Sequence, residues 1–77
     1  MINLVIEFDD FEPFTIAIDS EDTVTNLKGT LSGWFGFDAN DIILKDCYRV
    51  ILYDGIKLKD LMLEEGSHVF GFLKNVD

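Results

Sequence analysis

The chain has 77 residues, a net charge of −9 and 48% hydrophobic residues. So much apolar content excludes an intrinsically disordered chain, and the negative charge opposes direct binding to nucleic-acid phosphates. No apolar run approaches the ~18 residues of a membrane span, so we expect no membrane insertion. A single cysteine cannot form an internal disulfide, which predicts an intracellular protein, and the length predicts one domain over residues 1–77.

Two alternating segments open the chain. Apolar and polar residues alternate over residues 2–8 and again over residues 14–18, which predicts two β-strands. Residues 9–13 form a polar break that ends in Pro13, a residue that neither continues a helix nor donates to a central strand ladder. We therefore predict an antiparallel hairpin.

The apolar period changes to helical spacing over residues 24–35, which predicts a helix. Asp22 and Thr23 precede it, and both residue types cap helix N-termini because a side-chain oxygen accepts the free backbone N–H groups. Inside the helix, Gly29 and Gly33 each cost roughly 1 kcal/mol relative to alanine. That cost predicts a neighbouring element packed closely against both glycines.

The second half of the chain predicts three more strands. Residues 42–44 and 50–53 are short runs typical of strands, and residues 54–55 (Asp-Gly) are a strong turn signal. Residues 58–63 fit a brief helical turn, and residues 68–73 fit a last strand. The predicted order is β-β-α-β-β-β, an α+β fold in which one helix packs across a mixed sheet.

Several segments stand in the order that they have in ubiquitin: residues 14–18, 22–24, 26–28, Leu31, 54–55, 58–60 and Ser67. Through them the chain resembles the ubiquitin-like β-grasp superfamily over nearly its whole length. The resemblance implies a non-catalytic domain that binds other proteins. Because no glycine follows Leu73, we expect this domain not to be conjugated to other proteins.

Two narrower resemblances concern the partner. Residues 40–44 through 58–60 are similar to the non-conjugated homologous-to-ubiquitin splicing modifiers, which bind a short helical motif in spliceosomal proteins. Asp22 would correspond to the acid that pairs with the partner's arginine in that family. Residues 24–27 and 34–37 are similar to the N-terminal self-association domain of coilin, a nuclear-body scaffold. The chain lacks the Leu-Pro-Pro segment of that domain, and it has residues 72–73 (Phe-Leu) where the splicing modifiers have a tyrosine pair.

These resemblances imply an intracellular, nuclear protein that takes part in mRNA splicing or other RNA-processing assemblies. The alternative is a self-associating scaffold domain that forms homo-oligomers. A second alternative is a small component of a bacterial secretion or oxygenase complex, since such complexes also use β-grasp proteins.

The last strand carries the candidate binding surface. The ubiquitin resemblance implies that the odd-numbered residues of 69–73 face the helix, which turns Phe70 and Phe72 outward. In the alternative, Phe70 and Phe72 lie in the core and the odd-numbered residues face outward. An exposed apolar patch usually marks an interface. The predicted partner-binding residues are Ile43, Lys45, Phe70, Phe72 and Asp22.

Charge is uneven along the chain. Residues 1–41 hold nine acidic residues and one basic residue, whereas residues 42–77 hold six and five. Lys45 belongs to an expected basic patch in the second half. Acidic and basic patches on different surfaces favour head-to-tail self-association. The predicted self-association residues are Asp9, Asp10, Glu12, Arg49, Lys57 and Lys59.

Other chemically suggestive residues are not expected to form a site. Cys47 and His68 lie on different predicted elements, so we expect no enzyme activity and no cofactor. Residues 38–41 are acidic but lack the turn glycine of a calcium-binding loop, so we expect no metal. Trp34 and Phe35 are expected in the core or at its rim.

Overall fold

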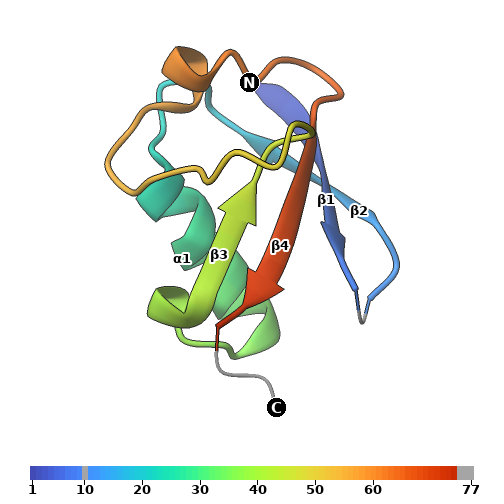
Figure 1. Ribbon diagram of the computed structural model, residues 1–77. Coiled ribbons are helices and arrows are strands. Elements are labelled where there is room, and N and C mark those ends of the chain that lie inside the picture. Colours follow the sequence, from blue (N-terminus) through green and yellow to red (C-terminus); the bar gives the residue numbers. More distant parts are fainter. Residues whose placement is uncertain (10, 75–77) are drawn as a thin grey trace.

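The computed structural model describes residues 1–9 and 11–74. Its elements follow in the order β1 (Ile2–Phe8), β2 (Phe14–Ile18), α1 (Val24–Phe35), the 3-10 turn η1 (Ala39–Asp41), β3 (Ile42–Lys45), the 3-10 turn η2 (Leu58–Leu61) and β4 (His68–Leu73). The helix lies against one face of a four-stranded sheet (Figure 1). This arrangement confirms the α+β, ubiquitin-like fold class. No helix in the described part of the chain is long and apolar enough to cross a membrane.

The sheet has the strand order β2-β1-β4-β3. β1 pairs with β2 in antiparallel fashion, which confirms the hairpin, and β3 pairs with β4 in the same way. The two central strands, β1 and β4, are parallel, with Ile6 opposite Val69. Parallel neighbours require a crossover connection, and α1 lies on that connection.

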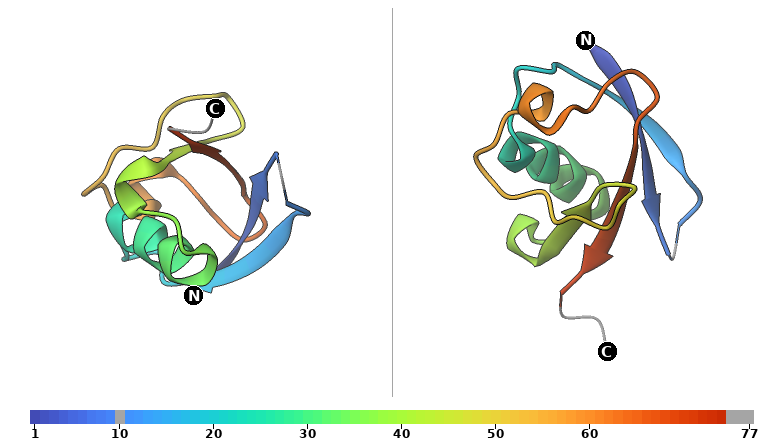
Figure 2. Two further views of the ribbon diagram at one scale, coloured as in Figure 1. Left: turned by 90° about the horizontal axis from the view of Figure 1, so that it is seen from below. Right: turned by 45° about the horizontal axis from the view of Figure 1, so that its top comes forward.

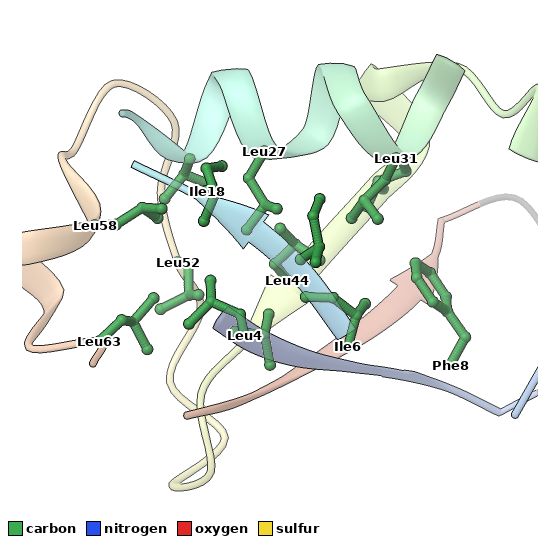
Figure 3. Packing of buried hydrophobic residues seen from close by; sticks show 14 residues of the cluster. Leu4, Ile6, Phe8, Ile18, Leu27, Leu31, Leu44, Leu52, Leu58 and Leu63 are labelled. Atoms are coloured by element: carbon green, nitrogen blue, oxygen red, sulfur yellow. The ribbon is translucent and has the colours of Figure 1, made fainter. Parts of the chain in front are cut away.

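The core lies between the sheet and α1. Figure 3 shows Leu27 and Leu31 of the helix pointing toward Leu4, Ile6 and Leu44 of the strands, and all five side chains are fully buried. Among the described residues no polar or charged side chain is buried. Full burial of a side chain of this size contributes about 1.5–3 kcal/mol. The core is therefore held by apolar packing alone.

The predicted strand over residues 50–53 is wrong, because only one β-bridge joins this segment to the end of β3. The carboxylate of Asp46 accepts two backbone N–H groups of the loop after β3, and Arg49 has a left-handed φ of 65°. The Leu52 N–H donates to the Leu44 carbonyl at 2.8 Å, and the Leu52 side chain is buried in the core. The segment therefore stays against the end of β3 through single contacts and forms no continuous ladder with it.

The helix begins and ends at well-defined caps. The Thr23 hydroxyl accepts the Asn26 N–H at 3.3 Å, whereas the Asp22 carboxylate accepts the Asn26 side-chain amide at 3.2 Å. Thr23 is therefore the N-cap, and Asp22 precedes it. At the other end Gly36 has a φ of 76°, and its N–H donates to the Ser32 carbonyl. A glycine in this left-handed conformation is the usual end of a helix.

The close neighbour expected at Gly29 and Gly33 is wrong. Both glycines are exposed, and a Cβ atom built at either one would meet nothing within 4 Å. Gly71 on β4 is the contrasting position, because a Cβ atom there would overlap the Phe8 ring. The close approach that requires glycine is therefore made by β4, not by the helix.

We expect Gly29→Ala and Gly33→Ala each to raise the free energy of unfolding by roughly 0.5–1 kcal/mol, because alanine restricts the unfolded chain and meets no obstacle in the helix. Urea denaturation measures the change. Gly36→Ala is the control and should destabilise the domain, since Gly36 has a φ of 76°. A loss of stability in both helix variants would contradict the open surroundings of these positions.

Candidate functional site

The sheet face opposite α1 carries four of the five predicted partner-binding residues. Val69 is fully buried against the core, while Phe72 is 38% exposed and Phe70 is half-buried on the other face. Phe70 and Phe72 therefore point away from the helix. In the register of the sheet, Ile43 stands opposite Phe72 and Lys45 stands opposite Phe70. The four side chains lie on one face because both strands have the same alternation.

The loop after β3 folds over this open face beside β4 (Figures 1 and 2). It closes one side of a hollow of about 530 Å³, here called the β4 hollow. The Nζ atom of Lys45 lies 5.1 Å from the centre of the Phe72 ring, within range of a cation–π interaction. The β4 hollow is lined by Asp9, Lys45, Asp46, Cys47, Arg49, Phe70 and Phe72.

The charged groups of the β4 hollow differ in how they are engaged. The Asp46 carboxylate holds its own loop by accepting the N–H groups of Tyr48 and Val50, each at 2.9 Å. None of the ion pairs among residues 1–9 and 11–74 includes Lys45 or Arg49. An apolar floor flanked by two such cations suits a ligand that has both an apolar group and a negative charge.

The predicted basic patch is divided in the structure. Lys57 and Lys59 do not line the β4 hollow; both pair with Glu21, at 3.3 and 2.9 Å. The cause is long-range, because the segment that carries them bridges to the residues just before α1. The expected grouping of Lys45 and Arg49 with these two lysines is therefore wrong.

Asp22 lies apart from the β4 hollow, beside Glu21 and its two lysine partners, Lys57 and Lys59, here called the Glu21 cluster. Its backbone carbonyl accepts the Leu58 N–H at 2.9 Å, and its half-buried side chain contacts Asn26. Asp22 thus helps to join η2 to the start of α1. A contact between Asp22 and a partner's arginine stays a prediction.

The predicted self-association acids are also divided. Asp9 lines the β4 hollow beside Lys45 and Arg49, whereas Glu12 is exposed in the loop between β1 and β2. Asp10 lies outside the described residues. Acidic and basic groups therefore meet on one surface of the molecule, not only on separate surfaces.

A second hollow, of about 520 Å³, lies at the outer side of β3 and contains Ile43. Lys28 and Asp54 line it and pair at 2.9 Å, next to Tyr53, which is 64% exposed. No period in the sequence indicates this site, because it depends on where the irregular segment after β3 runs. Phe35 packs against the core as expected, but Trp34 is 58% exposed at the rim.

The residues considered for catalysis or metal binding occupy different surroundings. Cys47 is exposed in the β4 hollow, and His68 Nδ1 lies 2.9 Å from Glu7 Oε2. The Asp38 carboxylate caps η1 by accepting the Asn40 N–H. Within the described ranges, no group of three His, Cys, Asp or Glu side chains is placed to hold a metal ion.

The capping assignment predicts different costs at neighbouring positions. Thr23→Ala should lower the free energy of unfolding by about 1 kcal/mol, because it removes the oxygen that accepts the Asn26 N–H. Asp22→Asn should cost less than half as much, since an amide oxygen still accepts the Asn26 side chain. Urea denaturation of both variants measures the difference, and equal losses would refute the assignment of Thr23 as the cap.

The Glu21 cluster predicts a pH dependence. Hydrogen bonds from Lys59 and then Lys57 hold the pKa of Glu21 below its usual value of 4.5. The same contact raises the pKa of Lys59 above 10.5. A lowered carboxyl pKa stabilises the fold above the unfolded-state value, and this contribution is lost as the pH falls through the folded-state value.

Glu21→Gln should therefore lower the melting temperature at neutral pH, and the difference from the unmodified chain should shrink as the pH falls below 4.5. Thermal melts over a pH series measure this. Glu64→Gln is the control, since Glu64 is exposed and its carboxylate has no ion pair among the described residues. A difference that stays constant with pH would argue against the Glu21 pairing.

Comparison of the sequence with models of known protein families found no match, and comparison with curated proteins found none either.

Proposed function

We propose that this chain is a non-catalytic protein-interaction domain that binds a short segment of a partner in the β4 hollow. The observation that carries the proposal is the combination of an apolar floor, Phe70 and Phe72, with two cations that have no ion pair within the described ranges. Phenylalanine rings are costly to leave in water, and an apolar patch of this kind usually marks an interface.

The arrangement of the sheet supports this proposal. α1 covers one face and satisfies the apolar side chains there, so Phe70 and Phe72 gain nothing from the core. Lys45 sits over the Phe72 ring and Arg49 stands in the loop beside it. A partner residue with an apolar side chain would cover the rings, and a neighbouring carboxylate would meet the cations.

A role in nuclear RNA-processing assemblies is part of the same proposal and rests on the resemblance to ubiquitin-like splicing modifiers. Those modifiers act by binding, which agrees with an open sheet face. The location in the nucleus stays a prediction.

Self-association is the second candidate function. The observation that favours it is the place of Asp9, which lines the β4 hollow close to Lys45 and Arg49. The acidic loop of a second copy, with its exposed Glu12, would present the same carboxylate chemistry to those cations. Exposed ion pairs contribute at most about 1 kcal/mol each, so burial of Phe72 would have to supply the rest.

The first test is peptide selection on the purified domain. Peptides selected from a random library should be rich in apolar and acidic residues, and Phe72→Ala should weaken their binding tenfold or more, about 1.4 kcal/mol. Arg49→Glu should weaken it by reversing a charge of the hollow. Tyr53→Ala is the matched control, because Tyr53 is an exposed aromatic residue outside the β4 hollow. Equal effects of Phe72→Ala and Tyr53→Ala would refute the site.

Sedimentation velocity over a range of concentrations separates the two candidates. A partner-binding domain stays monomeric, whereas a self-associating domain sediments faster as its concentration rises. Salt should weaken self-association because exposed charges are screened, and Arg49→Glu should disperse the oligomer. A monomer at high concentration and low salt would remove the second candidate.

A further inference from the structure

Aromatic side chains form a continuous strip where the β1–β2 loop meets the end of α1. The ring centres of Phe11 and Phe35 are 5.0 Å apart and stacked, those of Phe14 and Phe35 are 5.3 Å apart, and those of Phe14 and Trp34 are 5.9 Å apart. Phe37 stacks on Phe35, and its ring centre also lies 6.2 Å from that of Phe11. These five residues are here called the aromatic strip.

The aromatic strip is only partly used by the fold. Phe14, Phe35 and Phe37 pack against the core, but Trp34 is 58% exposed and Phe11 is 39% exposed. The ring contacts form a series in which Phe11 contacts Phe35, Phe35 contacts Phe14, and Phe14 contacts Trp34, so the two exposed rings are at its ends. The strip therefore exposes two aromatic rings to a ligand, while its other three rings are held in place by the core.

Acidic residues flank the aromatic strip along the chain. Glu12 follows Phe11 in the chain and Asp38 follows Phe37, and both acids are exposed. No lysine or arginine occurs in residues 1–27 or 29–44. The intervening Lys28 is engaged with Asp54, and its side chain is only 14% exposed. Aromatic faces beside carboxylates are complementary to a cationic ligand.

We propose that the aromatic strip binds an arginine-bearing segment of another protein. The planar guanidinium group stacks on an aromatic face and donates hydrogen bonds to carboxylates at the same time, which the ammonium group of lysine cannot do in one plane. Trp34 and Phe11 supply the faces, and Glu12 and Asp38 supply the acceptors. Nucleic acids are disfavoured here because the acidic surface repels phosphates.

This surface is separate from the β4 hollow. The aromatic strip and the lining of the hollow share no residue, and the hollow contains two cations, Lys45 and Arg49, whereas the strip contains none. The two proposals therefore stand or fall independently.

The test uses the single tryptophan of the chain, Trp34, as a reporter within the strip. A short peptide of alternating arginine and glycine is titrated into the intact domain while Trp34 emission is recorded. We expect a saturable change in emission. The matched lysine–glycine peptide should bind at least roughly threefold more weakly than the arginine–glycine peptide, since lysine lacks the planar group. Equal responses to both peptides would show attraction by net charge alone and would overturn the proposal, as would the absence of a saturable change.

Variants localise the effect. Glu12→Gln should weaken arginine-peptide binding roughly threefold, whereas Glu64→Gln, which removes an exposed acid elsewhere, should not change it. Phe11→Leu keeps the apolar bulk but removes one aromatic face, so it should weaken binding without unfolding the domain, as checked by circular dichroism. Phe72→Ala should leave arginine-peptide binding unchanged. Equal losses in Glu12→Gln and Glu64→Gln, or a loss in Phe72→Ala, would overturn the assignment to the strip.

Discussion

The parallel pairing of β1 with β4 is the contact on which the rest of the structure depends. It joins segments more than sixty positions apart, as in the pairing of Val5 with His68. The outer strands β2 and β3 pair with β1 and β4 respectively, so they are connected only through this central pair. Contacts just beyond the strands extend it: the Asn3 carbonyl accepts the Gly66 N–H at 2.7 Å, and both carboxylate oxygens of Glu65 bind Asn3 at 3.0 Å. This arrangement places the middle of the sheet at the junction of the two halves of the chain.

The same arrangement determines which surfaces remain for binding. One helix can cover only one face of four strands, so each strand buries one set of alternating side chains and presents the other. On β4 the presented set includes two phenylalanines, and the loop after β3 gives them charged neighbours. At the far end of the helix, the fold gathers more aromatic rings than the core can enclose. Both candidate surfaces are thus by-products of how a small domain distributes its apolar residues.

Much of this architecture could be predicted, because the spacing of apolar residues within each segment indicates whether it forms a strand or a helix. Residues 2–8, 14–18, 24–35 and 68–73 have clear alternation or helical spacing, and all four form the expected elements. Residues 50–53 have strand-forming side chains, but after the turn held by Asp46 they form only one bridge to β3, and no local pattern predicts that turn. The candidate site divides in the same way. Alternation puts Phe70 and Phe72 on one face of the last strand, and the resemblance to ubiquitin was needed to predict that this face is the outer one. The pairing of Lys57 and Lys59 with Glu21 depends on contacts between distant segments.

The contact between Gly71 and Phe8 has a consequence for how this sequence can change. Any side chain at position 71 collides with the ring at position 8, so a larger residue on β4 is compatible only with a smaller one on β1. The two positions are therefore coupled, and homologous chains should vary at them together or at neither. Because Gly71 lies between Phe70 and Phe72, β4 approaches the Phe8 ring on one face and carries the two rings of the β4 hollow on the other.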